Sequence, residues 1–123
     1  MLEQGKFAEA LSKFLHTLDI NEKYMPRHPN YAEALNNVGF TYKNGDIMNA
    51  TDYFNRALEF CQTHLSETHE MTAITYLALE LIMNEDQYQL AVDYINRATA
   101  IYNHLKLSCH QNRLLSKTRR FTR

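Results

Sequence analysis

The chain contains three stretches that repeat one pattern of small and large apolar residues. The stretches begin at Gln4, Asn44 and Asn84. In each, an alanine is followed four positions later by a large apolar residue and three positions after that by a small one. These triplets are Ala10/Phe14/Thr17, Ala50/Phe54/Ala57 and Ala91/Ile95/Ala98. The alanines are 40 and 41 residues apart (50 − 10 and 91 − 50), and a fixed period of this length predicts a helical repeat array.

Apolar residues between the repeats also recur at helical spacing, and three glycines and two prolines in 123 residues leave room for long helices. No segment alternates apolar and polar residues in the manner of a half-buried strand. The sequence therefore predicts an all-α protein. The expected helices span about Lys6–Lys23, Tyr31–Asn44, Ile47–His64, Glu67–Met83 and Gln87 to His104 or Leu107, with a possible sixth over Cys109–Arg119.

Polar residues mark the breaks between these helices. Asn30 or a neighbour is expected to cap the second helix, and Asp46 the third. Gly45 is suited to a left-handed C-terminal geometry. Ser66 and Glu70 stand at the spacing of a capping box before the fourth helix.

Charge divides the chain into an acidic body and a basic end. Residues 1–103 carry fourteen acidic and seven basic residues, whereas residues 104–123 carry six basic residues and no acid. The acidic body argues against nucleic acid binding by that part. We expect a helical domain over 1–107 and a basic tail over 108–123, either a short helix or disordered. Such a tail is either solvated or bound to RNA, acidic lipid or an acidic protein surface.

Cys61 and Cys109 show no paired spacing. They are expected to be free thiols in a reducing compartment, which favours a cytoplasmic protein. No stretch approaches eighteen consecutive apolar residues, so no membrane span is expected. The start of the chain runs into repeat sequence without a charged and apolar leader.

The segment from Ala34 to Phe60 resembles a tetratricopeptide repeat. In that family, helix A carries a bulky residue, a Leu-Gly pair and a Tyr, a Gly-Asp turn follows, and helix B carries an Ala–aromatic–Ala triplet. The corresponding positions are Leu35, Val38, Gly39, Tyr42, Gly45, Asp46, Ala50, Phe54 and Ala57. Small residues at such positions let two helix backbones approach closely, and the aromatic rings fill the space between layers.

The resemblance covers residues 4–104 and about two and a half repeats. The first unit lacks its helix A, and the third departs from the pattern at Ala78, Asp86 and Ile95. The long period and the stretch HPNYAEALNN are similar to a subgroup found in kinesin light chains, spindle-orientation adaptors and bacterial peptide receptors. The resemblance implies a right-handed superhelical stack of antiparallel helix pairs.

The same resemblance implies a non-enzymatic adaptor or scaffold that binds a peptide segment of a partner in a concave groove lined by the A helices. Asn37 stands where the family has an Asn that hydrogen-bonds ligand backbone, and an amide both donates and accepts hydrogen bonds. Helix A of this unit lacks the run of Lys and Arg that resembles a clamp for a C-terminal carboxylate. The expected groove residues are Glu33, Asn37, Phe40, Asn44, Thr72, Thr75, Tyr76 and Leu79.

The same residues also allow other interpretations of the groove and of the function. The asparagines of the second helix, Asn36 and Asn37, are also consistent with plain surface residues, and Tyr76 and Leu79 with internal packing. The protein is alternatively a structural subunit that self-associates through its terminal helices, because Phe7, Leu11 and Phe14 form an apolar flank. A third alternative is a regulatory receptor for a small secreted peptide.

The sequence offers little for catalysis or for cofactors. Cys61, His64 and His69 give the closest pairs of metal-ligand residues, and they lack the four matched ligands of a zinc site. No glycine-rich loop marks a phosphate site or an activated nucleophile. The carboxylates at Glu85 and Asp86 fit helix capping. We therefore expect no catalytic residue, no metal and no cofactor.

Overall fold

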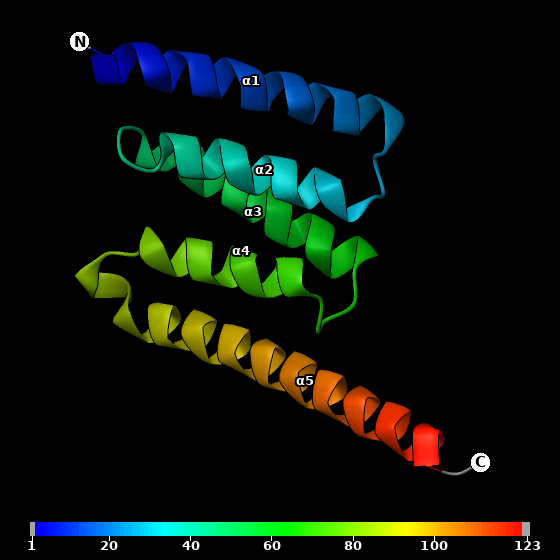
Figure 1. Cartoon of the computed structure of the whole chain (residues 1–123). Coiled ribbons are helices and arrows are strands. Elements are labelled where there is room, and N and C mark those ends of the chain that lie inside the picture. Colours follow the sequence, from blue (N-terminus) through cyan, green and yellow to red (C-terminus); the bar gives the residue numbers. More distant parts are fainter. Residues whose placement is uncertain (1, 122–123) are drawn as a thin grey trace.

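The structure, a computed structural model, describes the backbone of residues 2–121 and the side chains of residues 5–107. Its regular structure over this range is helical, with no strand (Figure 1), which confirms the predicted all-α class. The helices are α1 (Leu2–Tyr24), α2 (Pro29–Tyr42), α3 (Ile47–His64), α4 (Glu70–Leu81), the short 3₁₀ helix η1 (Glu85–Gln87) and α5 (Tyr88–Phe121).

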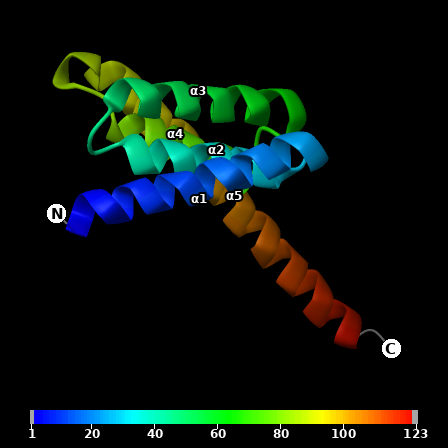
Figure 2. The ribbon, with the colours of Figure 1, turned by 90° about the horizontal axis from the view of Figure 1, so that it is seen from above.

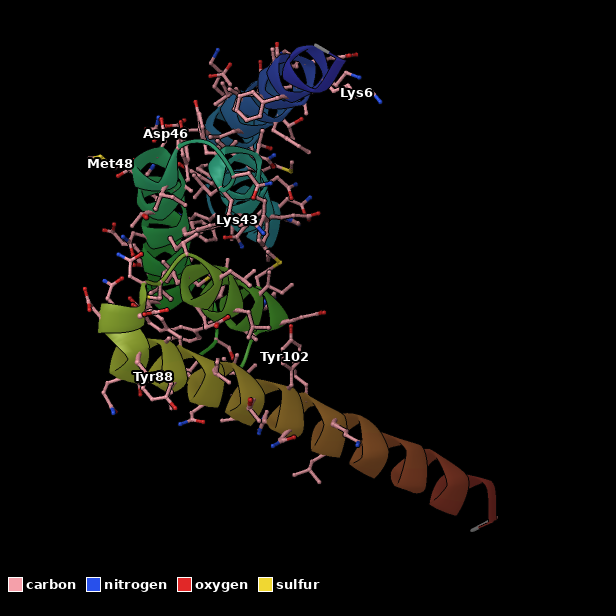
Figure 3. All side chains as sticks on the ribbon, turned by 90° about the vertical axis from the view of Figure 1, so that its left-hand side faces the viewer. Lys6, Lys43, Asp46, Met48, Tyr88 and Tyr102 are labelled. Atoms are coloured by element: carbon pink, nitrogen blue, oxygen red, sulfur yellow. The ribbon has the colours of Figure 1, made fainter. Side chains whose placement is uncertain are left out.

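The helices form an antiparallel stack of pairs. Helix α2 packs along α3, and α4 packs along α5, while α1 packs against α2 and α3 against α4. Seen from the side, α2 with Lys43 and α3 with Met48 lie on opposite sides of the stack (Figure 3). The N-terminal half-repeat, α1, and two complete pairs give the predicted two and a half repeats.

The middle pair, α2 and α3, shows why its small residues are needed. A Cβ atom added at Gly39 would lie 2.6 Å from Cε1 of the fully buried Phe54 ring. Ala50 and Ala57 have no exposed surface. Small side chains at these positions let α2 and α3 approach closely, as the repeat pattern predicts.

Side chains cap three of the helices. Asp46 Oδ1 accepts the backbone N–H of Asn49, so the predicted cap of α3 is confirmed. Nδ1 of His28 accepts the N–H of Asn30 at the start of α2, and Nδ1 of His69 does the same for α4. The cap of α2 is therefore a neighbour of Asn30, as predicted, whereas a histidine caps α4 in place of the expected Ser66-based capping box. Gly45 does not adopt a positive φ.

The largest departures from the predicted boundaries are in α4 and α5. Helix α4 spans Glu70–Leu81, and it starts later than predicted because Ser66 Oγ accepts the N–H of Thr68 in a turn before it. Helix α5 continues to Phe121, so no separate helix forms over Cys109–Arg119. Its C-terminal half leaves the body on the side away from α3 (Figure 2). The charged side chains beyond Leu107 lie outside the described residues.

None of the helices in the described part of the chain combines the length and the apolar character that a membrane span requires.

Candidate functional site

One side of α2 is open. Asn30 and Glu33 are exposed and Asn37 is half-buried, at the 3–4 residue spacing of a single helix face. Phe40 lies on the same side with 36% of its surface exposed. The rings of Phe40 and Phe54 pack in a T-shaped arrangement, with their centroids 5.0 Å apart. We call this side, with Asn30, Glu33, Asn37 and Phe40, the front face. Three of the predicted groove residues, Glu33, Asn37 and Phe40, therefore share one face of α2, whereas the exposed Asn44 lies in the turn that follows the helix.

A pocket of about 180 Å³ lies where the front face meets α1. Helix α1 contributes two polar residues that are one turn apart. Helix α2 contributes polar residues of the front face and one alanine. We call this site the asparagine pocket. It is lined by Thr17, Asn21, Asn30, Glu33, Ala34 and Asn37. The structure thus brings the predicted Glu33 and Asn37 together with residues of α1.

Asn21 is the most buried polar residue of this pocket, and it was not among the predicted groove residues. Only 5% of it is exposed, and its Nδ2 donates to the carbonyl oxygen of Thr17 at 2.9 Å. Its Oδ1 is buried and has no hydrogen-bond partner among the described residues. Asn21 follows Leu18 on the apolar stripe that begins at Phe7. A polar residue in an apolar stripe was the signal that could have revealed it.

The four groove residues predicted on α4 do not line the front of the stack. Thr75 and Leu79 are at most 1% exposed, and Thr72 and Tyr76 are also buried. This side of α4 faces neighbouring helices, because Leu79 packs with Phe54 of α3 while Tyr76 packs against α5. The residues predicted to form a groove floor on α4 are therefore buried among neighbouring helices.

The accessible side of α4 carries other residues. Leu81 is 57% exposed, and Ile74 and Leu77 are half-buried. These residues stand three to four positions apart, on the opposite side of α4 from Thr72 and Tyr76. An apolar strip thus replaces the hydroxyl-rich floor that the sequence predicts.

A buried chain of hydrogen bonds joins α2 and α4. Nδ2 of Asn36 donates to Oγ1 of Thr75 at 2.9 Å, and this hydroxyl donates to the carbonyl oxygen of Met71 at 2.8 Å. Asn36 is 2% exposed, so its interpretation as a surface residue was wrong. The pair fixes how α2 and α4 lie against each other.

A larger hollow of about 580 Å³ lies between the end of α3, the following loop and α5. Its lining includes Cys61, Thr72, Tyr76, Arg97 and His104. Burial raises the pKa of the Cys61 thiol above its usual range, and hydrogen bonds to threonine hydroxyls oppose the shift. The guanidinium of Arg97 is 2.9 Å from Asp93 and lies over the Tyr76 ring. The raised pKa disfavours the reactive thiolate form of Cys61, and the guanidinium of Arg97 is already paired with a carboxylate.

The apolar flank of α1 is partly covered. Leu11 and Phe14 are half-buried against α2, and the Phe7 ring, 40% exposed, meets Tyr42 edge-on at 6.3 Å. Beside this contact lies an open hollow of about 310 Å³ lined by Lys6, Glu9, Ala10, Lys13 and Phe14. In the second unit, the equivalent residues Ala50 and Phe54 are fully buried against α2 and α4.

Metal-ligand side chains do not gather in the described residues: no group of three or more His, Cys, Asp or Glu residues is placed to hold an ion. Cys61 is a free buried thiol, and the side chain of Cys109 lies outside the described part. Glu85 and Asp86 stand in the first turn of η1, where their charge favours the helix start.

Comparison with known families matches residues 1–62 to the tetratricopeptide repeat model. The match spans α1, α2 and most of α3, half of the chain, and the chain therefore belongs to the tetratricopeptide repeat family. Repeats of this family generally mediate protein–protein interactions, which supports a non-enzymatic adaptor role. No curated protein and no solved structure matches the chain.

Proposed function

We propose that the protein docks an extended peptide segment of a partner along the front face of α2. The observation that carries this proposal is the asparagine pocket. There, the half-buried Asn37 stands beside the exposed Glu33 and Asn30, and Asn21 of α1 faces the same space. Four polar side chains from two helices thus share a concave site.

The chemistry of these side chains fits a peptide backbone. Each Asn amide donates two hydrogen bonds and accepts two, which matches the alternating C=O and N–H groups of an extended chain. Phe40, farther along the front face, offers an apolar contact for a ligand side chain. Leu81 of α4 is also an exposed apolar side chain. Together these features support binding without any catalytic step.

The test compares faces of the stack. Asn37→Ala should weaken binding of partners captured by pull-down and identified by mass spectrometry. The expected loss is about 1–3 kcal/mol, the cost of a ligand group left without its hydrogen bond. Asp52→Ala on α3 and Asn96→Ala on α5 are the controls, because both residues are exposed and remote from the pocket. All variants should melt at the wild-type temperature. Equal losses on all faces would refute the groove.

A second candidate function is assembly through α1. The open hollow at Ala10 and Phe14 supports it, since the equivalent Ala50 and Phe54 are fully buried in the second unit. A helix from another copy would restore that burial. Light scattering of the wild type should then show self-association at low micromolar concentration, and Ala10→Arg should abolish it. A monomeric wild type would exclude assembly through this hollow.

A further inference from the structure

We propose that the asparagine pocket receives the positively charged end of a lysine or arginine side chain from the bound segment. This inference rests on the proposed function and specifies its ligand. It is carried by the charge, the hydrogen-bonding capacity and the size of the pocket.

The charge of the pocket is negative. Glu33 is the single ionisable residue among the six that line it. The nearest described cations of α1 are engaged elsewhere, since Lys13 pairs with Glu9 at 3.4 Å and Lys23 with Asp19 at 3.3 Å. No described cation lies within ion-pair distance of the Glu33 carboxylate. An incoming ammonium or guanidinium group would therefore meet an available carboxylate.

The pocket also offers hydrogen-bond acceptors to a cation. Asn30 and Asn37 line it beside Glu33, and the oxygen of a side-chain amide accepts two hydrogen bonds. Lysine and arginine end groups carry donors and no acceptors. They match the amide oxygens and the Glu33 carboxylate at once, whereas a carboxylate would add a further acceptor.

The size of the pocket fits one side chain. Sites for whole small molecules are usually about 300–1,000 Å³, and this pocket encloses about 180 Å³. It opens beside Asn37, which the proposed function assigns to the ligand backbone. A segment held there can direct one side chain between α1 and α2. The acidic body, seven bases against fourteen acids in residues 1–103, attracts a basic segment toward it.

The experiment uses the full chain and two small probes. N-acetyl-arginine amide is titrated against the ¹⁵N-labelled protein, and N-acetyl-citrulline amide, of similar shape but neutral, is the matched control. At millimolar probe concentrations, the arginine probe should shift the side-chain amide signals of Asn21, Asn30 and Asn37. The citrulline probe should bind about fivefold more weakly, since a partly exposed ion pair contributes up to about 1 kcal/mol.

Variants separate the pocket from general attraction to an acidic protein. Glu33→Gln should remove the preference for arginine over citrulline, while Asp52→Asn, an exposed carboxylate on α3, should leave it unchanged. Equal shifts with both probes, or no shift with either, would overturn the inference. The proposed function is judged separately. If Asn37→Ala weakens partner capture and Glu33→Gln does not, the groove stands and the cation site fails.

Discussion

Replacing Gly39 with alanine tests the close contact on which the middle helix pair depends. The added Cβ would lie 2.6, 2.8 and 3.0 Å from three carbons of the Phe54 ring. Distances below 3.0 Å require a shift. The ring is fully buried, and its other neighbours include Phe40 at a 5.0 Å ring separation. The ring therefore has no open space into which it can move.

Two effects oppose each other in this variant. Overpacking a well-filled core costs about 1–3 kcal/mol, and the three short contacts place this case toward the upper end. Alanine in a helix interior is more favourable than glycine by about 1 kcal/mol. The net loss of unfolding free energy should be about 1–2 kcal/mol. For a chain of this size, that corresponds to a fall in melting temperature of roughly 3–10 °C.

Urea unfolding followed by circular dichroism measures this loss. Gly5→Ala is the matched control in α1, because no atom lies within 4 Å of its added Cβ; it should be neutral or slightly stabilising. The double variant Gly39→Ala/Phe54→Leu should lose less than the sum of the single losses, since the smaller leucine removes the clash. A Gly39→Ala protein as stable as the wild type would refute the argument.

Three further outcomes are expected. Ala57→Leu should destabilise by about 1–3 kcal/mol in urea unfolding, because Ala57 has no exposed surface; an unchanged midpoint would contradict this. His69→Ala should cost about 1 kcal/mol by removing the cap of α4, whereas His69→Asn should retain most of it. In a Cys109→Ser background, the Cys61 thiol should react slowly with a disulfide reagent in the native state. Burial raises its pKa, so its contribution to stability should decline as the pH rises above the range of an ordinary thiol; fast native labelling would contradict its burial.

Local spacing determined much of this fold. The triplet Ala50, Phe54 and Ala57 predicted that two alanines and one aromatic ring are packed inside the stack, and all three residues are fully buried. Asp46 before an amphipathic run fixed the start of α3, and its predicted span is the observed one, Ile47–His64. These features depend on residues close in sequence, whose geometry the helix itself sets.

The candidate site was predictable in part for the same reason. Glu33, Asn37 and Phe40 share a face of α2 by periodicity alone, and the structure leaves that face open, whereas Asn44 lies in the turn after the helix. The asparagine pocket was not predictable, because Asn21 comes from α1, and its position opposite α2 depends on how the two helices pack. A contact between helices has no counterpart in either helix's own periodicity.

Helical periodicity sets which residues lie on the same side of each helix, whereas tertiary packing sets which side faces solvent. On α4, Thr72 and Tyr76 share a side as predicted, yet that side is buried and Leu81 is exposed instead. Periodicity fixes the angles between side chains but leaves the rotation of the helix about its axis free. That rotation is set by neighbours, here by the contacts of Leu79 with α3 and of Tyr76 with α5, which bury more apolar surface inside the stack.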